Sequence, residues 1–600
     1  MRTNLFMKRL VTTVLLAFPA LLLLSYTPVQ ASGKNKGEKK RLAKAAGKTT
    51  AQDELVVTVT QLGPAQAEID ALMTQLPNRP TLAKALDGGN FRLLSCDFLE
   101  NFAKNNQSLP PTRYRANFYN YASNFNVHAE GNIDGSGTDT VIVDNDQPPP
   151  SPEEYQYAVS LLREADTFGL GLKEGSLLAS QAMPPVLEAS IVDGIIERTI
   201  NIQLLTSGGK SKYANEVVGV NLVRNKFVRY QGGAPPTSRA APQACGVPDS
   251  GQQSSGIGVA GQFQFTVQQN GATLWNFIVN RPSSSSGTNV KRSGVELRNV
   301  MYKGKMVLKR IHTPILNVRY VADACGPYRD WQYQEDMFQA NGTDVAPGVR
   351  DCGTNIATTA LETGNDTGNF RGVAFYRQGN EVVLVSEMQA GWYRYVNEYR
   401  LANDGTIRPR YGYGATDDSC VCAPHVHHVY WRMDFDIGAA ANNVIRPSRR
   451  EFAWGNPYTN ETKLFRSSTA RQNWLVQNRQ TLDSYMIRPN SNDGYAQSQS
   501  DGGFSAGDLW LLKYHSDGSG NPTEIDDGFT GVTCSVNNPL PCSARLDNFV
   551  TGEALTDDIV VWYGAHFLHN DGGNNNPDIT GPNILTGTHV HGPDLVPARW

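Results

Sequence analysis

The pattern of apolar and polar positions divides the 600-residue chain into successive blocks. Residues 53–145 contain "AQAEIDALMTQL", whose apolar spacing is typical of a helix, and end in the alternating stretch "TDTVIVD". Residues 150–235 repeat this order, with helical "PEEYQYAVSLLREA" before the alternating "RTINIQLLT" and "EVVGVNLVRNKFVRY". Pro-rich "DNDQPPPSPEE" separates the two blocks, and residues 236–256 form a second linker rich in turn residues. The pattern predicts two small α+β domains.

The pattern changes again at residue 257. From there to residue 600, short alternating stretches such as "GQFQFTVQ", "NEVVLVS" and "DDIVVWYG" recur between turn residues, and no long helical pattern is present. The 56 glycines and 33 prolines agree with many turns. We therefore expect a mainly β protein, whose largest part, residues 257–600, is one β-sandwich.

Residues 1–31 have the pattern of a secretory signal peptide. A basic start precedes the apolar run "LVTTVLLAFPALLLL", and "VQA" ends the segment at Ala31 with small residues. The alternative is a membrane anchor, but the run is short for a span, and no later segment is apolar enough to cross a membrane. The pattern therefore predicts a protein that is secreted or periplasmic, with no membrane span once the signal is removed.

Export makes the eight cysteines candidates for disulfides. Cys534 and Cys542 flank "SVNNPLP" and suggest a closed loop, and Cys325 with Cys352 is a second candidate pair. The connectivity of the others does not follow from their spacing.

The charge is unevenly distributed. The chain carries a net charge of −3. The signal holds three basic residues, and the linker at residues 32–52, which we expect to be disordered, holds seven basic residues and one acid. The body that follows therefore carries a net charge of about −12. This argues against nucleic acid as a partner and is compatible with a cationic substrate.

Eight of the ten histidines follow residue 420. In "HVHHVYWRMDFD", alternation places His425 and His427 on the apolar face of a strand and turns His428 away from it. Two histidines side by side suit one metal ion, and a third ligand must come from elsewhere. His569, in "DDIVVWYGAHFLHND", shares that face if the two strands pack alike. The alternative is a set of hydrogen-bonded core histidines, and the roles of His566, His589 and His591 stay open.

A second group of candidate ligands is acidic. Parity places Asp434, Asp436 and Asp558 on the face opposite the histidines. Carboxylates completed by backbone carbonyls, here those of Phe435 and Ile559, suit a hard cation such as calcium. The alternative is a solvated strand face.

The stretches "HVHHVYWRMD", "DDIVVW" followed by His569, and "FSAGDLWLLKY" together resemble the copper amine oxidase family over roughly residues 300–570. The resemblance implies copper on His425, His427 and His569, a homodimer, and cystatin-like folds for the two small domains. It also implies that a tyrosine is converted to topaquinone (TPQ). The best match is Tyr393 in "AGWYRY", where Trp392 replaces the family's Asn and Arg394 replaces its acid.

For the reaction, the resemblance implies a catalytic base at Asp336, with Glu335 as the alternate, and a tyrosine at Tyr320 that hydrogen-bonds the quinone. The expected function is oxidative deamination of a small primary amine by oxygen, with release of aldehyde, ammonia and hydrogen peroxide. The alternative is a copper-binding relative without a functional quinone, acting as a metal-binding or structural module.

Overall fold

A computed structural model describes most of the chain after residue 53. The described ranges are 54–102, 108–145, 147–148, 150–182, 191–192, 195–206, 216–229, 246, 261–285, 292–320, 327–416, 421, 425–450, 453–467, 472–496, 507–516, 522–524, 545–556, 558–569 and 590–600. The predicted signal peptide, the basic linker, the Cys534–Cys542 loop and His589 lie outside them. No helix within these ranges is both long and apolar enough to span a membrane.

Two small domains, each a four-stranded antiparallel sheet with helices, follow the predicted α+β pattern. The first has sheet order β2-β3-β4-β5 and the second β11-β10-β9-β6. The elements of the first are α2 (Gln66–Gln75), α3 (Pro80–Leu86), β2 (Phe91–Phe102), β3 (Ser108–Asn120), β4 (Phe125–Asn132) and β5 (Thr140–Asp144). Those of the second are α4 (Pro152–Arg163), α5 (Gly169–Glu174), β6 (Leu177–Gln181), β9 (Thr199–Thr206), β10 (Glu216–Asn221) and β11 (Lys226–Arg229).

Helix α4 shows how local sequence fixes one of these elements. Ser151 caps its first turn: the Ser151 hydroxyl accepts from the Glu154 N–H, and the Glu154 carboxylate accepts from the Ser151 N–H. Pro152 at the first helical position supplies the required backbone angle. The apolar stripe Tyr155, Ala158 and Leu162 is buried against the sheet of this domain.

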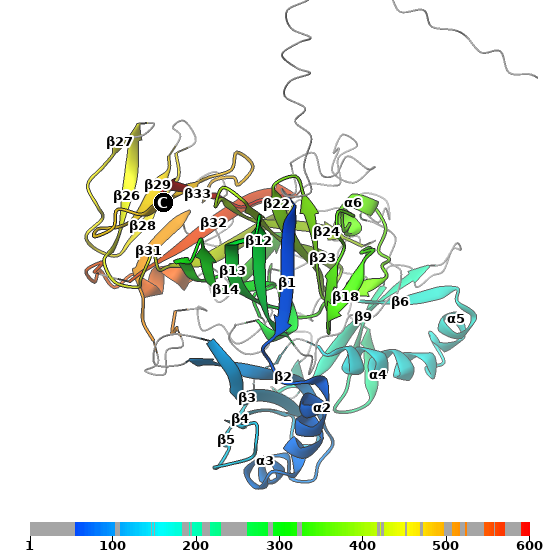
Figure 1. Cartoon of the computed structure of the whole chain (residues 1–600). Helices are drawn as coiled ribbons and strands as arrows, with labels where there is room; N and C mark the ends of the chain where they lie inside the picture. The colour runs from blue at the N-terminus through cyan, green and yellow to red at the C-terminus, as the bar shows by residue number, and fades with distance from the viewer. Residues whose placement is uncertain are drawn as a thin grey trace, which may run out of the picture. The chain divides into compact units, whose positions relative to one another are not determined.

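Two large sheets make up most of the rest of the described structure (Figure 1). The first runs, in order, β1 (Leu55–Gln61), β12 (Gln262–Gln269), β13 (Ala272–Asn280), β14 (Glu296–Tyr302), β15 (Lys305–Tyr320), β25 (His425–Phe435), β32 (Ile559–His569), β31 (Leu509–Lys513) and β28 (Thr462–Leu464), with β16 (Pro327–Arg329) paired to β15. The second runs β18 (Thr343–Ala346), β19 (Val349–Asp351), β21 (Val373–Gln378), β22 (Glu381–Ala390), β23 (Tyr393–Ala402), β24 (Ile407–Ala415), β33 (Asp594–Arg599), β30 (Ser484–Arg488), β29 (Trp474–Asn478), β26 (Asn443–Arg450) and β27 (Ala453–Trp454).

The remaining elements are short. They are β7 (Ile191–Val192) paired with β8 (Ile195–Ile196), β17 (Met337–Phe338) paired with β20 (Phe370–Arg371), the helix α6 (Ala360–Thr363), and three 3-10 turns at Leu76–Asn78, Pro282–Ser284 and Arg545–Phe549.

The two large sheets share one hydrophobic core, and each turns its alternate residues towards the other. Val429 and Trp431 of β25 lie in the same buried cluster as Tyr395 of β23, and Phe265 of β12 meets Phe375 of β21 edge to face at 5.3 Å. This arrangement is the predicted β-sandwich. We call the faces that meet in this core the inner faces.

Two features differ from the sequence expectations. Strand β1, assigned to the first α+β domain, instead pairs antiparallel with β12 and forms an edge of the first large sheet. Its alternating residues, with Leu55 buried, complete the core of the sandwich. The predicted Cys325–Cys352 pair is wrong, because Cys352 is a buried free thiol, as is Cys96. Cys325 itself lies outside the described residues.

Candidate active site

The His-x-His stretch forms the start of β25, near the middle of the first large sheet. His425 and His427 project from its inner face, as the alternation predicts, and both side chains are fully buried. Their rings lie side by side, with centroids 5.0 Å apart. The alternation of side chains along the strand thus places two imidazoles next to each other inside the sandwich.

The third predicted histidine enters from the neighbouring strand. Strand β32 pairs antiparallel with β25 without a bulge, and the register places His569 directly opposite His425. Residues directly opposite in an antiparallel pair project to the same face of the sheet. His569 therefore occupies an inner-face position beside the other two histidines. Its side chain lies outside the described part of the chain.

Tyr393 comes from the opposing sheet and meets these histidines. It begins β23, is fully buried, and its hydroxyl lies 2.8 Å from Nε2 of His425. Its ring is edge-on to that of His427, with centroids 4.9 Å apart. The candidate cofactor tyrosine and the candidate copper ligands therefore form one buried group built from both sheets. Tyr320 also occupies an inner-face position of the first large sheet, because its backbone lies opposite His425 in the β15–β25 register.

Two further tyrosines that sequence reasoning did not single out enclose this group. Tyr413 of β24 stacks on His427 with centroids 4.0 Å apart, and Tyr395 stacks on Tyr393 at 5.3 Å. The Tyr395 hydroxyl donates a hydrogen bond to Oδ2 of Asp330, which is buried. The alternation in "YRY" and "YGYG" carries the signal for both tyrosines, since i and i+2 share a strand face.

Asp336, the expected base, lies on the other side of β23. Its Oδ2 is 2.8 Å from Nε of Arg394, which also binds Asp366 at 2.5 Å, and all three side chains are fully buried. Arg394 follows Tyr393 directly in the strand and therefore projects to the opposite face. Burial raises the pKa of Asp336 to about 6, although the Arg394 charge opposes the rise. The structure thus separates Asp336 from the Tyr393–histidine group.

Glu335, the alternate base, is held in another ion pair. Its carboxylate accepts from the Arg281 guanidinium and, at 2.9 Å, from the Ser283 hydroxyl. Glu335 and its partners are buried, so the group acts as a structural tie between segments distant in sequence.

His428 was expected to point outwards. It does project to the face opposite His425 and His427, but that face is also covered, and His428 is fully buried. Its Nδ1 lies 2.8 Å from Nδ1 of His566, its direct partner on β32. His566 Nε2 donates to the Gly507 carbonyl oxygen at 2.9 Å. His566 is therefore a cross-strand partner of His428 and lies on the face opposite the position of His569.

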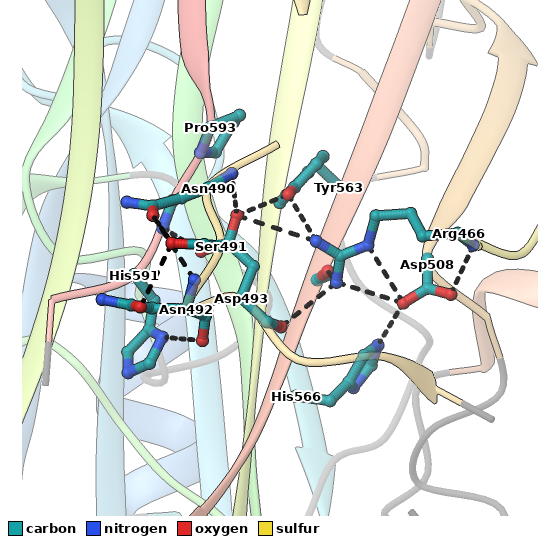
Figure 2. A network of polar contacts seen from close by, with 12 residues as sticks. Arg466, Asn490, Ser491, Asn492, Asp493, Asp508, Tyr563, His566, His591 and Pro593 are labelled. Atoms are coloured by element: carbon teal, nitrogen blue, oxygen red, sulfur yellow. Dashed lines mark hydrogen bonds and ion pairs between the residues drawn. The ribbon is translucent and has the colours of Figure 1, made fainter. Parts of the chain in front are cut away.

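A buried polar network continues from His566 (Figure 2). Asp508 lies 3.7 Å from His566 and pairs with Arg466, whose Nη1 donates to the Tyr563 hydroxyl. Tyr563 in turn donates to Asp493, and the Asp493 carbonyl oxygen accepts from the His566 N–H at 2.8 Å. This network fastens the end of β32, just before His569.

His591 lies near the other end of Figure 2. Its Nδ1 is 2.8 Å from the Asn492 carbonyl oxygen, and its backbone bridges Tyr411 of β24. Its ring lies 6.4 Å from Tyr413 between centroids.

The three predicted acidic ligands meet at the opposite end of the β25–β32 pair. Carboxylate oxygens of Asp434, Asp436 and Asp558 lie within 4.8 Å of one another, and Phe435 is opposite Ile559 in the register. Burial and mutual repulsion raise the pKa of Asp436 to about 8 and that of Asp558 to about 9. Burial also raises the pKa of Asp434, against the effect of Arg432. Three carboxylates at such distances favour either shared protons or a hard cation.

The histidine group and the acidic group offer different metal-binding atoms. Imidazole nitrogens with an adjacent phenol suit copper or zinc, whereas an all-oxygen group suits calcium or magnesium. The residues around His425 and His427 therefore fit a copper ion. Tyr393 is in hydrogen-bond contact with one of those histidines.

No family model matches the sequence, and no curated protein matches it. Solved structures do match. A copper-containing benzylamine oxidase from Hansenula polymorpha is 12% identical with a TM-score of 0.50, covering 93% of this chain and 95% of its own. The Aspergillus nidulans amine oxidase is 13% identical with a TM-score of 0.51, covering 92% and 89%. The Pichia pastoris lysyl oxidase is 12% identical with a TM-score of 0.52, covering 92% and 90%. The chain therefore has the fold of the copper-containing amine oxidases.

Proposed function

We propose that this protein is a copper-dependent primary-amine oxidase that makes its own quinone cofactor, topaquinone, from Tyr393. The observation that carries the proposal is the 2.8 Å contact between the Tyr393 hydroxyl and Nε2 of His425 inside the sandwich. His425, His427 and His569 hold copper in this proposal. A tyrosine with only a packing role in the core would not require a cluster of histidines on the facing sheet.

When present, the Tyr393-derived quinone accepts two electrons from a primary amine and passes them to oxygen, so that amine, water and oxygen give aldehyde, ammonia and hydrogen peroxide. The protein supplies position and exclusion of water. Tyr395 and Tyr413 stack on Tyr393 and His427 and limit the motion of both rings. In this proposal Tyr320, whose backbone lies opposite His425, donates its hydroxyl to the cofactor oxygen.

A second candidate function is copper binding without a quinone. The observation that favours it is the pair of departures beside Tyr393, since Trp392 is buried and Arg394 is tied to Asp366. A residue whose neighbours are both held in a core has little room to rotate.

The test is reconstitution of metal-free protein with copper under air, followed by a quinone stain and a visible spectrum. We expect a quinone band in the wild type and its complete loss in Tyr393→Phe, with copper still bound. Tyr399→Phe is the matched control, because Tyr399 is buried on the same face of β23 and donates to the Val295 carbonyl oxygen. A band that survives in Tyr393→Phe contradicts the cofactor assignment, and bound copper without any band supports the second candidate.

We also propose export, a homodimer and calcium at the Asp434–Asp436–Asp558 group as parts of this function. Export predicts that the mature protein begins at Ser32, which N-terminal sequencing of secreted material checks. Sedimentation of the copper-loaded protein distinguishes a dimer from a monomer.

A further inference from the structure

Four buried aromatic side chains lead from the histidine group to the polar network of Figure 2. Tyr395 lies edge-on to His427, with ring centroids 6.1 Å apart, and Tyr411 follows at 5.8 Å from Tyr395. Trp431 lies 6.4 Å from Tyr411, and Tyr563 lies 6.1 Å from Trp431. Each step falls within the range of about 4.5–7 Å that is usual for packed ring pairs. We call these four residues the aromatic chain.

Each end of the aromatic chain has a carboxylate that accepts a hydrogen bond from the phenol. Tyr395 donates to Oδ2 of Asp330, and Tyr563 donates to Oδ2 of Asp493 at 2.5 Å. Burial raises the pKa of both phenols well above the usual range, so each keeps its proton at neutral pH. A tyrosine that loses an electron becomes a strong acid and releases this proton. Each carboxylate is positioned to accept it.

The two central residues of the aromatic chain have no carboxylate partner. The Tyr411 hydroxyl donates to the amide oxygen of Gln332 at 2.9 Å, and an amide is a far weaker base than a carboxylate. Nε1 of Trp431 is buried and makes no hydrogen bond to any described residue. An indole can lose an electron and keep its N–H proton. The central residues therefore suit the passage of an electron, whereas the two ends suit a radical that persists.

We propose that the aromatic chain delivers electrons to hydrogen peroxide at the histidine site, so that radicals form on Tyr563 and Tyr395. Hydrogen peroxide is a product of the proposed reaction. The inference rests on the copper-binding part of the proposed function. It does not rest on the quinone, because the aromatic chain begins beside His427 and does not pass through Tyr393.

Two tyrosines are oxidised for each peroxide that is reduced. Hydrogen peroxide takes up two electrons and two protons from solvent and becomes two molecules of water. Tyr563 supplies the first electron through the two central residues, and its phenolic proton passes to Asp493. Tyr395 supplies the second electron, and its proton passes to Asp330. One electron from a small reductant of the ascorbate class, with the proton held by the carboxylate, restores each tyrosine.

The experiment uses copper-loaded Tyr393→Phe protein as the parent, because the proposed quinone and its radical cannot form in it. Metal analysis first measures the bound copper. The protein is then mixed with hydrogen peroxide, frozen rapidly and studied by electron paramagnetic resonance. We expect a narrow tyrosyl signal beside the broad copper signal, and further narrowing when the protein contains ring-deuterated tyrosine. Absence of a tyrosyl signal in copper-loaded parent protein overturns the inference.

Variants made in this parent test the path. Tyr563→Phe and Trp431→Phe should each remove at least half of the signal, since one of the two radicals can no longer form, and the double variant should lose no more than either alone. Tyr485→Phe is the matched control. Tyr485 is also buried in the sandwich, but it donates to the Gly405 carbonyl oxygen at 2.9 Å, which is not a base. A full signal in Tyr563→Phe, or an equal loss in Tyr485→Phe, overturns the inference.

Asp493→Asn separates proton transfer from packing and also covers a Tyr563 variant that does not fold. The amide still accepts the hydrogen bond but does not take the proton, so we expect the same loss of signal as in Tyr563→Phe. An unchanged signal overturns the role of Asp493.

A second measurement does not require a trapped radical. Mass spectrometry of peptides that contain His425 and His427, after peroxide treatment, should show more added oxygen in Tyr563→Phe than in the parent, because the oxidation is no longer moved away from the histidines. Equal oxidation contradicts this role of the aromatic chain. Protein that binds no copper contradicts the proposed function and the inference together, whereas bound copper without a quinone band in wild type contradicts only the quinone.

Discussion

At the scale of single residues, Arg394 marks one departure of this chain from the family it resembles. It replaces an acid beside Tyr393 and pairs with Asp336 and Asp366, with no exposure of any of the three side chains. The guanidinium of Arg394 therefore lies on the outer face of the second sheet. The preceding residue, Tyr393, lies on the inner face, because successive side chains of a strand project to opposite faces.

Arg394→Met should be strongly destabilising, because it leaves Asp336 and Asp366 buried without their cation. The expected loss in free energy of unfolding is about 3–5 kcal/mol in urea titrations at pH 7. Arg113→Met is the matched control. The Arg113 side chain is 47% exposed and pairs with Glu130, so its loss should cost at most about 1 kcal/mol. Equal losses in the two variants would show that Arg394 is not a structural tie.

Glu387, in the same outer layer, should make the stability of the protein depend on pH. Its carboxylate lies within 4.8 Å of those of Asp336 and Asp366, and burial, followed by the Asp336 charge, raises its pKa well above the usual range. Between the unfolded pKa of about 4.3 and this raised value, the folded protein binds more protons than the unfolded chain. Stability therefore falls as pH rises through this window.

Glu387→Gln should remove this contribution, because the amide is neutral at every pH in the window. Between pH 5 and pH 7, we expect the free energy of unfolding of wild type to fall more steeply than that of the variant, by at most about 1.4 kcal/mol per pH unit. Urea titrations at three pH values measure the difference. Parallel pH profiles would contradict a raised pKa at Glu387.

At the scale of elements, the β25–β32 pair shows how far the sequence is informative. Alternation predicts the faces of His425, His427 and Asp434, because a regular strand leaves no other arrangement. The register that places His569 opposite His425 agrees with the parity argument, since the pair contains no bulge. Strand period and strand pairing thus account for most of the histidine site and for the meeting of the acidic group.

Alternation does not predict where side chains point in segments that are not regular strands. Residues 330–336 lie almost wholly outside regular strands, so spacing alone cannot say whether Asp330 or Asp336 faces the core. Nor can it show that the partner of Arg394 is Asp366, 28 residues away. The face opposite His427 is a third example. Its polar residues suggest solvent, but His428 and His566 satisfy each other within a covered layer.

The end of β32 is held by the turn that contains Gly494. Its φ of +59° is a left-handed conformation, and a Cβ built there would lie 1.6 Å from the His566 carbonyl oxygen. The glycine therefore permits a close approach of two backbones three residues before His569.

Gly494→Ala should displace β32 and weaken the proposed copper binding as well as stability. Gly552→Ala separates strain from displacement, because Gly552 also has a positive φ, of +85°, but a Cβ there has no neighbour within 4 Å. Both variants carry the cost of a left-handed alanine, about 1–2 kcal/mol. We expect only Gly494→Ala to reduce copper occupancy at limiting copper, measured by metal analysis. Equal occupancy in both variants would show that the position of β32 does not depend on this turn.

At the scale of the whole molecule, the site depends on the packing of two sheets that come from distant parts of the chain. Tyr393 and Tyr413 belong to one sheet, and His425 and His427 to the other. The acidic group at the far end of β25 and β32 joins the same two central strands on their outer face. A cation bound there would stabilise the strand pair that also carries the histidines, without contacting them.

Removal of that cation should therefore lower stability in a pH-dependent way. Without it, the folded protein keeps protons on Asp436 and Asp558 up to pH values of about 8 and 9, whereas the unfolded chain loses them near pH 4. Stability of the cation-free protein consequently falls as pH rises from 4 to 9. The calcium proposed at this group would bind the ionised carboxylates, so its stabilising effect should be larger at pH 8 than at pH 5. At a hundredfold excess over the dissociation constant, binding adds about 2.7 kcal/mol.

The measurement is thermal unfolding of copper-loaded protein at pH 5 and pH 8, with calcium or with a calcium-selective chelator. We expect the melting temperature to drop on chelation mainly at pH 8, with copper content unchanged because the histidines lie on the other face of the sheet. Asp436→Asn removes one carboxylate and one source of repulsion, so it should melt higher than chelated wild type at pH 8 and respond little to calcium. A chelator effect of the same size at both pH values, or full calcium response in Asp436→Asn, would mean that the three carboxylates are not the site through which calcium acts.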